Sequence, residues 1–239
     1  MKIIAFETLD STNNYSKLNL DNIEDRTIVT TKVQTAGRGR FDRSWVDLGS
    51  ENIYMTIVLK PSGVFSETYS NLTQYLSLVL CQQLEEMGLE PKIKWPNDVL
   101  LNGKKMCGIL AEAVFRGANF RGLVLGIGVN LNADIAQVNQ IDRPATAINI
   151  ELGQKVDKAE FMEKLIEKFF LGYDDFVKNG FKSIKADYSK RASFLGQQLN
   201  ISIFNRIESG FSSCVDDNGA LVLVDSQGNE HAINMGEIV

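Results

Sequence analysis

The most basic stretch of this sequence runs from Lys32 to Arg43 and reads KVQTAGRGRFDR, with four basic residues and one acid. The whole chain has a net charge of −5, so this positive charge is local. Gly37 and Gly39 allow the backbone to approach a ligand, and Arg38 and Arg40 add forked guanidinium groups. The stretch therefore suits a carboxylate or phosphate, although a solvated basic loop is the alternative. It is neither a P-loop nor a dinucleotide-binding fingerprint.

A second stretch, KWPNDVLLNGKK, combines a large aromatic residue, a rigid proline and polar side chains. Its Asn-Gly pair, at 102–103, lies between two apolar runs and predicts a tight β-hairpin. Lys94 and Lys105 flank this hairpin, and a hairpin of this length brings its two ends close together. The alternative is an ordinary turn with solvated lysines.

Two further motifs are weaker when taken alone. GIGVN, at 126–130, places a glycine at every second position of an apolar strand and leaves one face without side chains, as if a flat group lay against it. Gly108 in the segment GILAE fits the same pattern, and close packing between elements is the alternative. DSTN, at 10–13, reads by itself as the cap of a helix.

Composition limits the classes of protein that these motifs can serve. With 239 residues, 44% hydrophobic and 23% charged, the chain has the profile of a soluble globular protein and lacks the basic surface of a general nucleic-acid binder. Cys81, Cys107 and Cys214 are far apart, which predicts buried thiols in a reducing compartment. His231 is the only histidine, so a Ser-His-Asp triad would depend on it. Neither a signal peptide nor a membrane span is recognisable, and we expect a cytoplasmic protein without membrane contact.

Hydrophobic periodicity predicts an α+β fold, a mixed or antiparallel sheet with helices followed by a small β-barrel. Within the first part, three consecutive strands around 94–132 are expected to be antiparallel. The domains are expected at 1–190 and 191–239. Strands are predicted at 2–9, 26–33, 52–60, 198–204, 210–216, 219–225 and 230–236, and helices at 12–20, 66–87, 158–179 and 181–194.

In combination the motifs are far more specific. DSTN, QTAGRGR followed by Trp45, KWPNDVLLNGKKMCGIL and GIGVN, in this order and spacing, resemble the biotin–protein ligases over residues 1 to 131. The C-terminal barrel, with its closing GEI, is similar to the small SH3-like domain of that family. The resemblance implies a biotin/lipoate ligase fold, related to class II synthetases. It points to the monofunctional type without an N-terminal DNA-binding domain, since the catalytic strand starts at residue 3.

This resemblance implies an ATP-dependent enzyme that converts biotin to biotinyl-5′-AMP. It would then transfer biotin to a lysine of the biotin carboxyl carrier protein of acetyl-CoA carboxylase, with Mg²⁺ accompanying ATP. The nucleophile of the first step would be the carboxylate of biotin, which agrees with a sequence poor in nucleophilic candidates. The enzyme would act as a monomer or homodimer, and no direct DNA-binding repressor role is expected.

The family motifs also imply roles for individual residues. Arg38 and Arg40, with the backbone of Gly39, would hold the carboxylate and the phosphates, and Lys105 would lie at their junction. Asp98 would orient the incoming lysine in the second step.

Biotin would occupy an apolar slot between the glycine-bearing strands, closed by Trp45. Asn130 would contact adenine, although no aromatic residue between Phe120 and Phe161 is available to stack on it. The biotin- and adenylate-binding residues implied by the motifs are Ser11, Thr12, Asn13 and Gln34 at the ureido end, with Gly37, Arg38, Gly39, Arg40, Trp45, Lys105, Gly108, Gly128 and Asn130.

Three alternatives stay open at this level. A lipoate–protein ligase shares the fold and the adenylation chemistry, but GRGR together with KWPND favours biotin. A non-catalytic biotin- or nucleotide-binding module would not need Lys105 at a reaction centre. A repressor would need a DNA-binding element and basic surface, which the sequence does not show.

Overall fold

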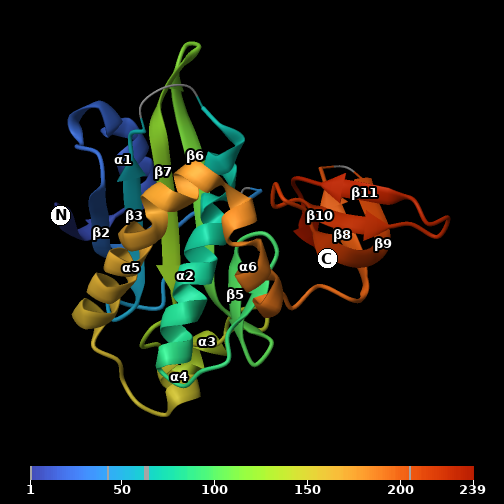
Figure 1. The fold of residues 1–239 in the computed structure, drawn as a ribbon. Coiled ribbons are helices and arrows are strands. Elements are labelled where there is room, and N and C mark those ends of the chain that lie inside the picture. Colours follow the sequence, from blue (N-terminus) through green and yellow to red (C-terminus); the bar gives the residue numbers. More distant parts are fainter. Residues whose placement is uncertain (1, 42, 62–64, 205) are drawn as a thin grey trace.

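Seven strands form one mixed sheet in the order β1-β2-β3-β7-β6-β5-β4 (Figure 1). The computed structural model describes residues 2–41, 43–61, 65–204 and 206–239. β1 and β2 are parallel, and every other pairing in this sheet is antiparallel, as predicted for the strands around 94–132. The strands are β1 Ile3–Leu9, β2 Thr27–Gln34, β3 Ile53–Leu59, β4 Lys92–Lys94, β5 Asp98–Leu101, β6 Lys104–Arg116 and β7 Asn119–Val129.

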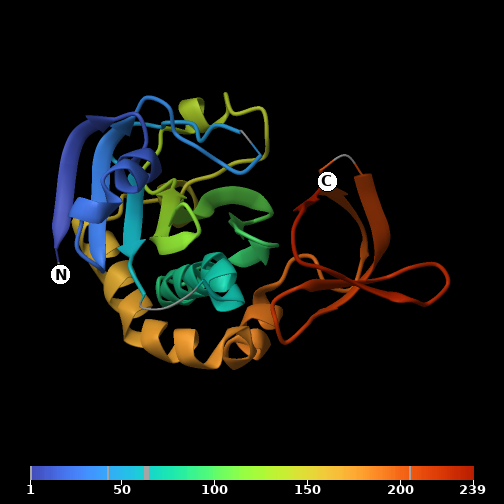
Figure 2. The same cartoon turned by 90° about the horizontal axis from the view of Figure 1, so that it is seen from above.

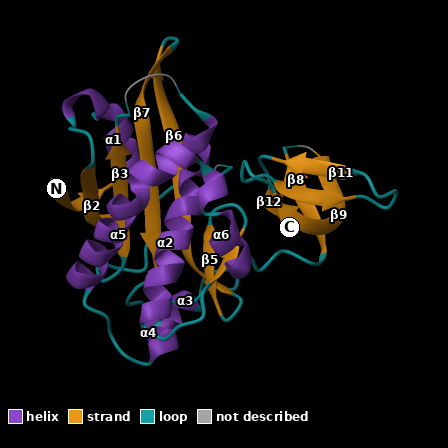
Figure 3. Ribbon diagram, viewed as in Figure 1, coloured by secondary structure: helices purple, strands orange, loops and turns teal. Residues whose placement is uncertain are grey.

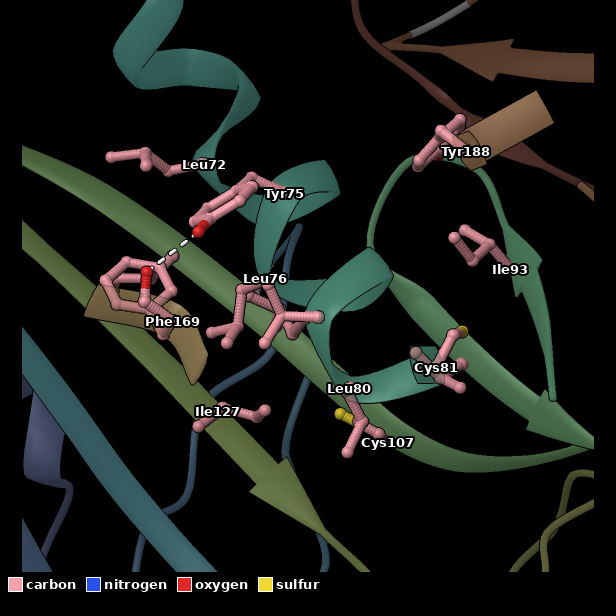
Figure 4. Packing of buried hydrophobic residues seen from close by; sticks show 14 of the residues in the cluster. Leu72, Tyr75, Leu76, Leu80, Cys81, Ile93, Cys107, Ile127, Phe169 and Tyr188 are labelled. Atoms are coloured by element: carbon pink, nitrogen blue, oxygen red, sulfur yellow. Dashed lines mark hydrogen bonds between the residues drawn. The ribbon is translucent and has the colours of Figure 1, made fainter. Parts of the chain in front are cut away.

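Two long helices cover one face of this sheet, as the view from above shows (Figure 2). These are α2, Leu72–Glu86, and α5, Lys158–Asn179. Leu76 and Leu80 of α2 are fully buried in the cluster that also contains Ile127 of β7 (Figure 4). A hydrogen bond also links the two helices, because the Tyr75 hydroxyl of α2 donates to the Phe169 carbonyl of α5 at 2.8 Å (Figure 4). The main core therefore lies between the sheet and these helices.

Shorter helical elements cover the other face and the ends of the sheet. The helix α1, Thr12–Leu18, packs on β2, β3 and β7, and a second apolar cluster that includes Val29, Val58 and Val124 lies on this side. Ser11 caps α1 by accepting from the Asn14 amide, as the motif predicted. The other helices are η1 Leu20–Asn22, η2 Glu67–Asn71, α3 Ile135–Val138, α4 Ile148–Leu152, η3 Phe181–Ser183 and α6 Lys185–Arg191.

Three predicted helices are longer than the observed ones, and the first, predicted at 12–20, ends as α1 at Leu18. The helix predicted at 66–87 begins as α2 only at Leu72, after the 3₁₀ turn η2, because Thr, Tyr, Ser and Asn in that turn are poor helix formers. Asn71 also bonds through Nδ2 to the Asn218 carbonyl of the C-terminal part, at 2.7 Å. The helix predicted at 181–194 is divided into η3 and α6 and ends at Arg191.

The described residues of the C-terminal part form strands and turns (Figure 3). They form a five-stranded antiparallel sheet in the order β11-β10-β9-β8-β12 that curls round on itself (Figure 2). The predicted fold class is confirmed, although the sequence indicated only four of these strands. β12 was missed because a strand of only two residues is too short to show the alternating hydrophobic pattern of a strand. The strands are β8 Gln198–Ile203, β9 Arg206–Val215, β10 Leu221–Val224, β11 Glu230–Ile233 and β12 Glu237–Ile238.

The C-terminal sheet is held against the first part by a turn between β9 and β10. The Gly219 carbonyl accepts from Gln74 Nε2 at 2.9 Å and from Trp95 Nε1 at 3.4 Å. Trp95 of the KWPND motif is buried here and serves as an anchor between the two parts. The domain boundary at 190/191 stays a prediction. In the described part of the chain, the helices are too short or too polar to traverse a lipid bilayer.

Candidate active site

A cavity of about 590 Å³ opens where the basic loop, β5 to β7 and the segment 141–145 meet. This volume lies in the range of small-molecule sites. All but one of the predicted site residues line it: Ser11, Thr12, Asn13, Gln34, Arg38, Gly39, Arg40, Trp45, Asp98, Lys105, Gly108, Gly128 and Asn130.

Gly37 is the exception, and its place in the basic loop explains why. Its carbonyl accepts from the Trp45 amide at 2.9 Å, and a Cβ at this position would lie 2.7 Å from the Trp45 carbonyl oxygen. Arg38 and Ser44 form an antiparallel bridge in the same loop, and the Gly39 amide donates to the Arg43 carbonyl at 2.7 Å. Gly37 was predicted to bind the substrate, but it shapes the loop and does not line the cavity.

The first turn of α1 forms a polar corner of the cavity. Gln34 Oε1 accepts from the Thr12 amide at 2.9 Å and lies 3.2 Å from Thr12 Oγ1. Thr56 Oγ1, on β3, is within hydrogen-bond distance of both Thr12 Oγ1 and Asn13 Oδ1, at 2.9 and 2.7 Å. These bonds fix the side chains that face the cavity before any ligand arrives.

The amide of Asn13 belongs to the protein framework in this corner. Its Nδ2 donates to the Leu110 carbonyl at 3.2 Å and to Glu112 Oε2 at 3.0 Å. A Cβ on Gly126 would come within 2.2 Å of Asn13 Oδ1, so this side chain requires the glycine beneath it. The ureido contact predicted for Asn13 is therefore better suited to its neighbours Ser11 and Thr12.

A flat group does lie against the glycine face of β6 and β7, and it is the indole of Trp45. A Cβ would lie 2.8 Å from the indole at Gly108 and 2.5 Å from it at Gly128. Lys105 Nζ lies 5.5 Å from the indole centroid, a cation–π distance. Trp45 Nε1 is buried and has no hydrogen-bond partner among the described residues. The glycine face is therefore shaped to lie against a planar, largely apolar group, and in this structure the Trp45 indole occupies it.

Lys105 lies at the other end of the slot, at the start of β6. Asn102 and Gly103, both with positive φ, make the predicted tight turn, and the Lys105 amide donates to the Pro144 carbonyl at 2.9 Å. Its Nζ lies 2.7 Å from Asp98 Oδ1, an ion pair without hydrogen-bond alignment. The sequence had not predicted this pair, which gives Asp98 a partner within the chain.

The two arginines of GRGR point to different places. Arg40 Nη1 donates to Asn97 Oδ1 at 3.3 Å, beside the hairpin that carries Lys105. Burial lowers the pKa of the Arg40 guanidinium, and the carboxylates of Glu237 and Asp98 offset this only in part. Arg40 is therefore a desolvated cation directed at the cavity, which is a strong attractor for an anion.

Arg38 lies on the opposite side, in an ion pair with Glu112 of β6 at 3.0 Å. Arg43 of the same loop is paired with Glu237 of β12, so the C-terminal sheet also reaches the cavity. Sequence reasoning missed Glu112 and Glu237. The signals were an acid inside an otherwise apolar strand and the acid of the closing GEI.

Asn130 directly follows β7, at the far side of the cavity. Its Nδ2 donates to the Thr146 carbonyl at 3.0 Å, and its amide donates to the Met106 carbonyl at 2.9 Å. These bonds hold the segment 141–147 against the sheet. The adenine contact assigned to Asn130 stays a prediction.

Comparison with known proteins gives the family. Residues 5–130 match the Biotin/lipoate A/B protein ligase family. The chain is 34% identical over 208 residues to the Biotin--[acetyl-CoA-carboxylase] ligase of Paracoccus denitrificans, covering 84% of this chain and 85% of that protein. It is 31% identical over 229 residues to the Bifunctional ligase/repressor BirA of Bacillus subtilis (strain 168), covering 95% of this chain and 70% of that protein.

A solved structure agrees with this. The biotin protein ligase from Aquifex aeolicus in complex with biotin and ATP matches with a TM-score of 0.86 and 25% identity, over 100% of this chain and 97% of that chain. The chain belongs to the biotin/lipoate A/B protein ligase family. Within that family, the resemblance to the biotin–protein ligases predicted from the motifs is confirmed.

Proposed function

We propose that this chain activates biotin with ATP and transfers it to a lysine of the biotin carboxyl carrier protein of acetyl-CoA carboxylase. The observation that carries the proposal is one cavity that holds a planar apolar slot, a polar corner at α1 and two cations, Arg40 and Lys105. The relatives named above as biotin ligases support it.

In the first step, a carboxylate oxygen of biotin attacks the α-phosphorus of ATP. The new bond is a carboxylic–phosphoric anhydride, the bond between the α-phosphorus and the bridging oxygen breaks, and pyrophosphate leaves. Because two anions must meet, fixed positive charge lowers the barrier. Lys105 lies where such a junction would form, at the end of the slot, and Arg40 lies beside it.

The polar corner would recognise the ureido ring of biotin through Ser11, Thr12 and Gln34. Sites that hydrogen-bond a polar group of the substrate reject analogues without it, since their own buried groups are then left unpaired. Lipoate has no ureido group. This corner therefore favours biotin over lipoate.

Mg²⁺ is expected with the nucleotide. Within the described ranges, no group of three or more His, Cys, Asp and Glu residues is placed to hold a metal ion. Asp98, which faces the cavity, already neutralises Lys105. The residues thus fit a metal that arrives with the triphosphate better than a resident one.

In the second step, the amine of the acceptor lysine attacks the acyl carbon of the adenylate. An amide bond forms, the carbon–oxygen bond to AMP breaks, and the amine loses a proton. The predicted role of Asp98 in orienting this lysine competes with its ion pair to Lys105. The pair must loosen before Asp98 can accept a bond from the acceptor.

The test is biotin-dependent exchange of labelled pyrophosphate into ATP, with lipoate as the control substrate. Lys105→Ala should lose exchange by about 10²-fold, because a fixed cation at the reacting centre is removed. Lys104→Ala is the matched control, since that neighbouring side chain is exposed and does not line the cavity. Exchange with lipoate in place of biotin would indicate a lipoate ligase. No exchange with either substrate would indicate a binding module.

A further inference from the structure

The carboxylate of Glu112 joins three elements beside the polar corner. Glu112 lies on β6. Its Oε1 accepts from Lys17 Nζ of α1 at 2.7 Å and from Arg38 Nη1 of the basic loop at 3.0 Å. Oε2 accepts from Asn13 Nδ2 at 3.0 Å. The Glu112 side chain is only 20% exposed, so these bonds are shielded from water on most sides. One carboxylate therefore ties the loop, the helix and the sheet together.

The charge of Glu112 is stabilised by these partners. Burial would raise the pKa of the carboxyl, but hydrogen bonds from Lys17 and Asn13 and the charges of Lys17 and Arg38 outweigh it and lower the pKa. The stability that these bonds supply is thus present above the ordinary value near 4.5 and is lost as the pH falls through the lowered pKa. Glu112 is ionised at neutral pH, and bonds to an ionised acceptor are about twice as strong as neutral ones.

Because Glu112 binds the side chain of Arg38, it also restrains the loop residues that are bonded to the Arg38 backbone and its neighbours. Its backbone pairs with Ser44, and the Trp45 amide donates to the Gly37 carbonyl at 2.9 Å. Fixing the side chain of Arg38 therefore limits how far Trp45 can move from the glycine face of the slot. Arg38 also donates to Asn14 Oδ1 at 3.1 Å, so its guanidinium is directed at α1 and β6.

We propose that Glu112 is a positioning residue for biotin activation. Through Arg38 it holds the loop that carries Trp45 at the glycine face of β6 and β7, and through Asn13 it fixes the polar corner. This inference rests on the function proposed above, because the slot is taken to bind biotin. In this proposal Arg38 fixes the loop that carries Trp45, whereas Arg40 and Lys105 bind the carboxylate and the phosphates.

The experiment compares Glu112→Gln with the wild type in pyrophosphate exchange. The glutamine keeps the size of the side chain and can still accept from Asn13, but it loses the charge that holds Arg38. We expect KM for biotin to rise by about tenfold and kcat to change by less than about threefold, because closure over the ligand is weakened and the reacting groups are intact. Glu112→Asp, which keeps the charge, should recover part of the affinity.

Two further variants separate a specific role from a structural one. Lys17→Met removes the other cation from the same carboxylate without touching the loop, and it should change KM by less than about twofold. Arg38→Met should raise KM as Glu112→Gln does, and the double variant should be no worse than either single one, since both changes break the same contact. Additive effects, or an equal effect of Lys17→Met, would refute the proposal, and so would a wild-type KM in Glu112→Gln.

A ligand-free readout keeps this inference distinct from the proposed activity. Acrylamide quenching of tryptophan fluorescence reports mainly on Trp45, because Trp95 is almost fully buried. Glu112→Gln should increase the quenching and Lys17→Met should not. If the wild type catalysed no biotin-dependent exchange, the proposed function would fail, and this measurement would still decide whether Glu112 holds the loop. Unchanged quenching in Glu112→Gln would overturn the inference.

Discussion

Lys105 and Asp98 face each other across the β5–β6 hairpin as an ion pair, with 2.7 Å between Nζ and Oδ1. Asp98 is only 16% exposed, so the pair is partly desolvated. A partly buried carboxylate orients its cation more strongly than a solvated one. Asp98 therefore fixes the Lys105 ammonium at the end of the slot.

This geometry predicts that Asp98→Asn slows adenylation. Without its partner charge the Lys105 side chain loses orientation, and we expect kcat of pyrophosphate exchange to fall by about tenfold, less than for Lys105→Ala. Transfer from preformed adenylate to the carrier protein is measured separately in single turnover. If Asp98→Asn slowed transfer alone and left exchange unchanged, Asp98 would orient the acceptor lysine instead.

Gly128→Ala is predicted to weaken biotin binding. The added methyl group would lie about 2.5 Å from the Trp45 indole, which must then shift off the glycine face. We expect KM for biotin to rise by about tenfold or more, with a smaller loss of kcat, since misplacement of a positioning group costs binding first. The matched test is Trp45→Leu, in which the collision is removed. Gly128→Ala should have little further effect in that background, and an equal loss in both backgrounds would contradict the explanation.

The sequence predicted most of the fold because the hydrophobic residues of its strands and helices recur with a clear period. The helix at 158–179 was placed to the residue, since Asp157 caps it and Gly180 ends it. The start of α2 and the strand β12 could not be placed, because one depends on a contact with Asn218 and the other has two residues. The turn before α2 contacts the C-terminal part, and β12 pairs with β8, and local patterns do not encode such long-range contacts.

The sequence predicted which residues line the cavity, but not which of their side chains bind one another. Motif order indicated which side chains share the cavity, including Lys105 and Asp98. It could not show that Arg38 and Arg40 diverge, because neither belongs to a regular element and their directions depend on distant partners, Glu112 and Asn97. Glu112 and Glu237 were missed for the same reason: their partners lie 74 and 194 residues away in the chain.

Thiol reactivity should distinguish the three cysteines. Burial raises the pKa of the Cys81 thiol to about 12 and that of Cys107 well above its usual range, so neither forms the reactive thiolate at pH 8. Cys214 is exposed. Iodoacetamide should therefore alkylate Cys214 in the native protein and all three cysteines after denaturation, as measured by peptide mass spectrometry. Labelling of Cys107 as fast as Cys214 would show that the core around α2 opens readily.

The ion pair between Arg43 and Glu237 couples the basic loop to the last strand, and its loss should affect catalysis more than folding. Both side chains are partly exposed, so Glu237→Gln should change the free energy of unfolding by less than about 1 kcal/mol. Its effect on kcat/KM for biotin and ATP should reach about fivefold, because the pair holds the loop that carries Arg40 and Trp45.

Arg43→Met should reproduce this effect, and the double variant should add little to it. Glu208→Gln is the matched control, since Glu208 is paired with Arg206 on the same sheet but does not line the cavity. Steady-state pyrophosphate exchange and urea unfolding provide the two readouts. A Glu237→Gln variant with wild-type kcat/KM would mean that the C-terminal sheet does not position the loop, and that Glu112 alone holds it.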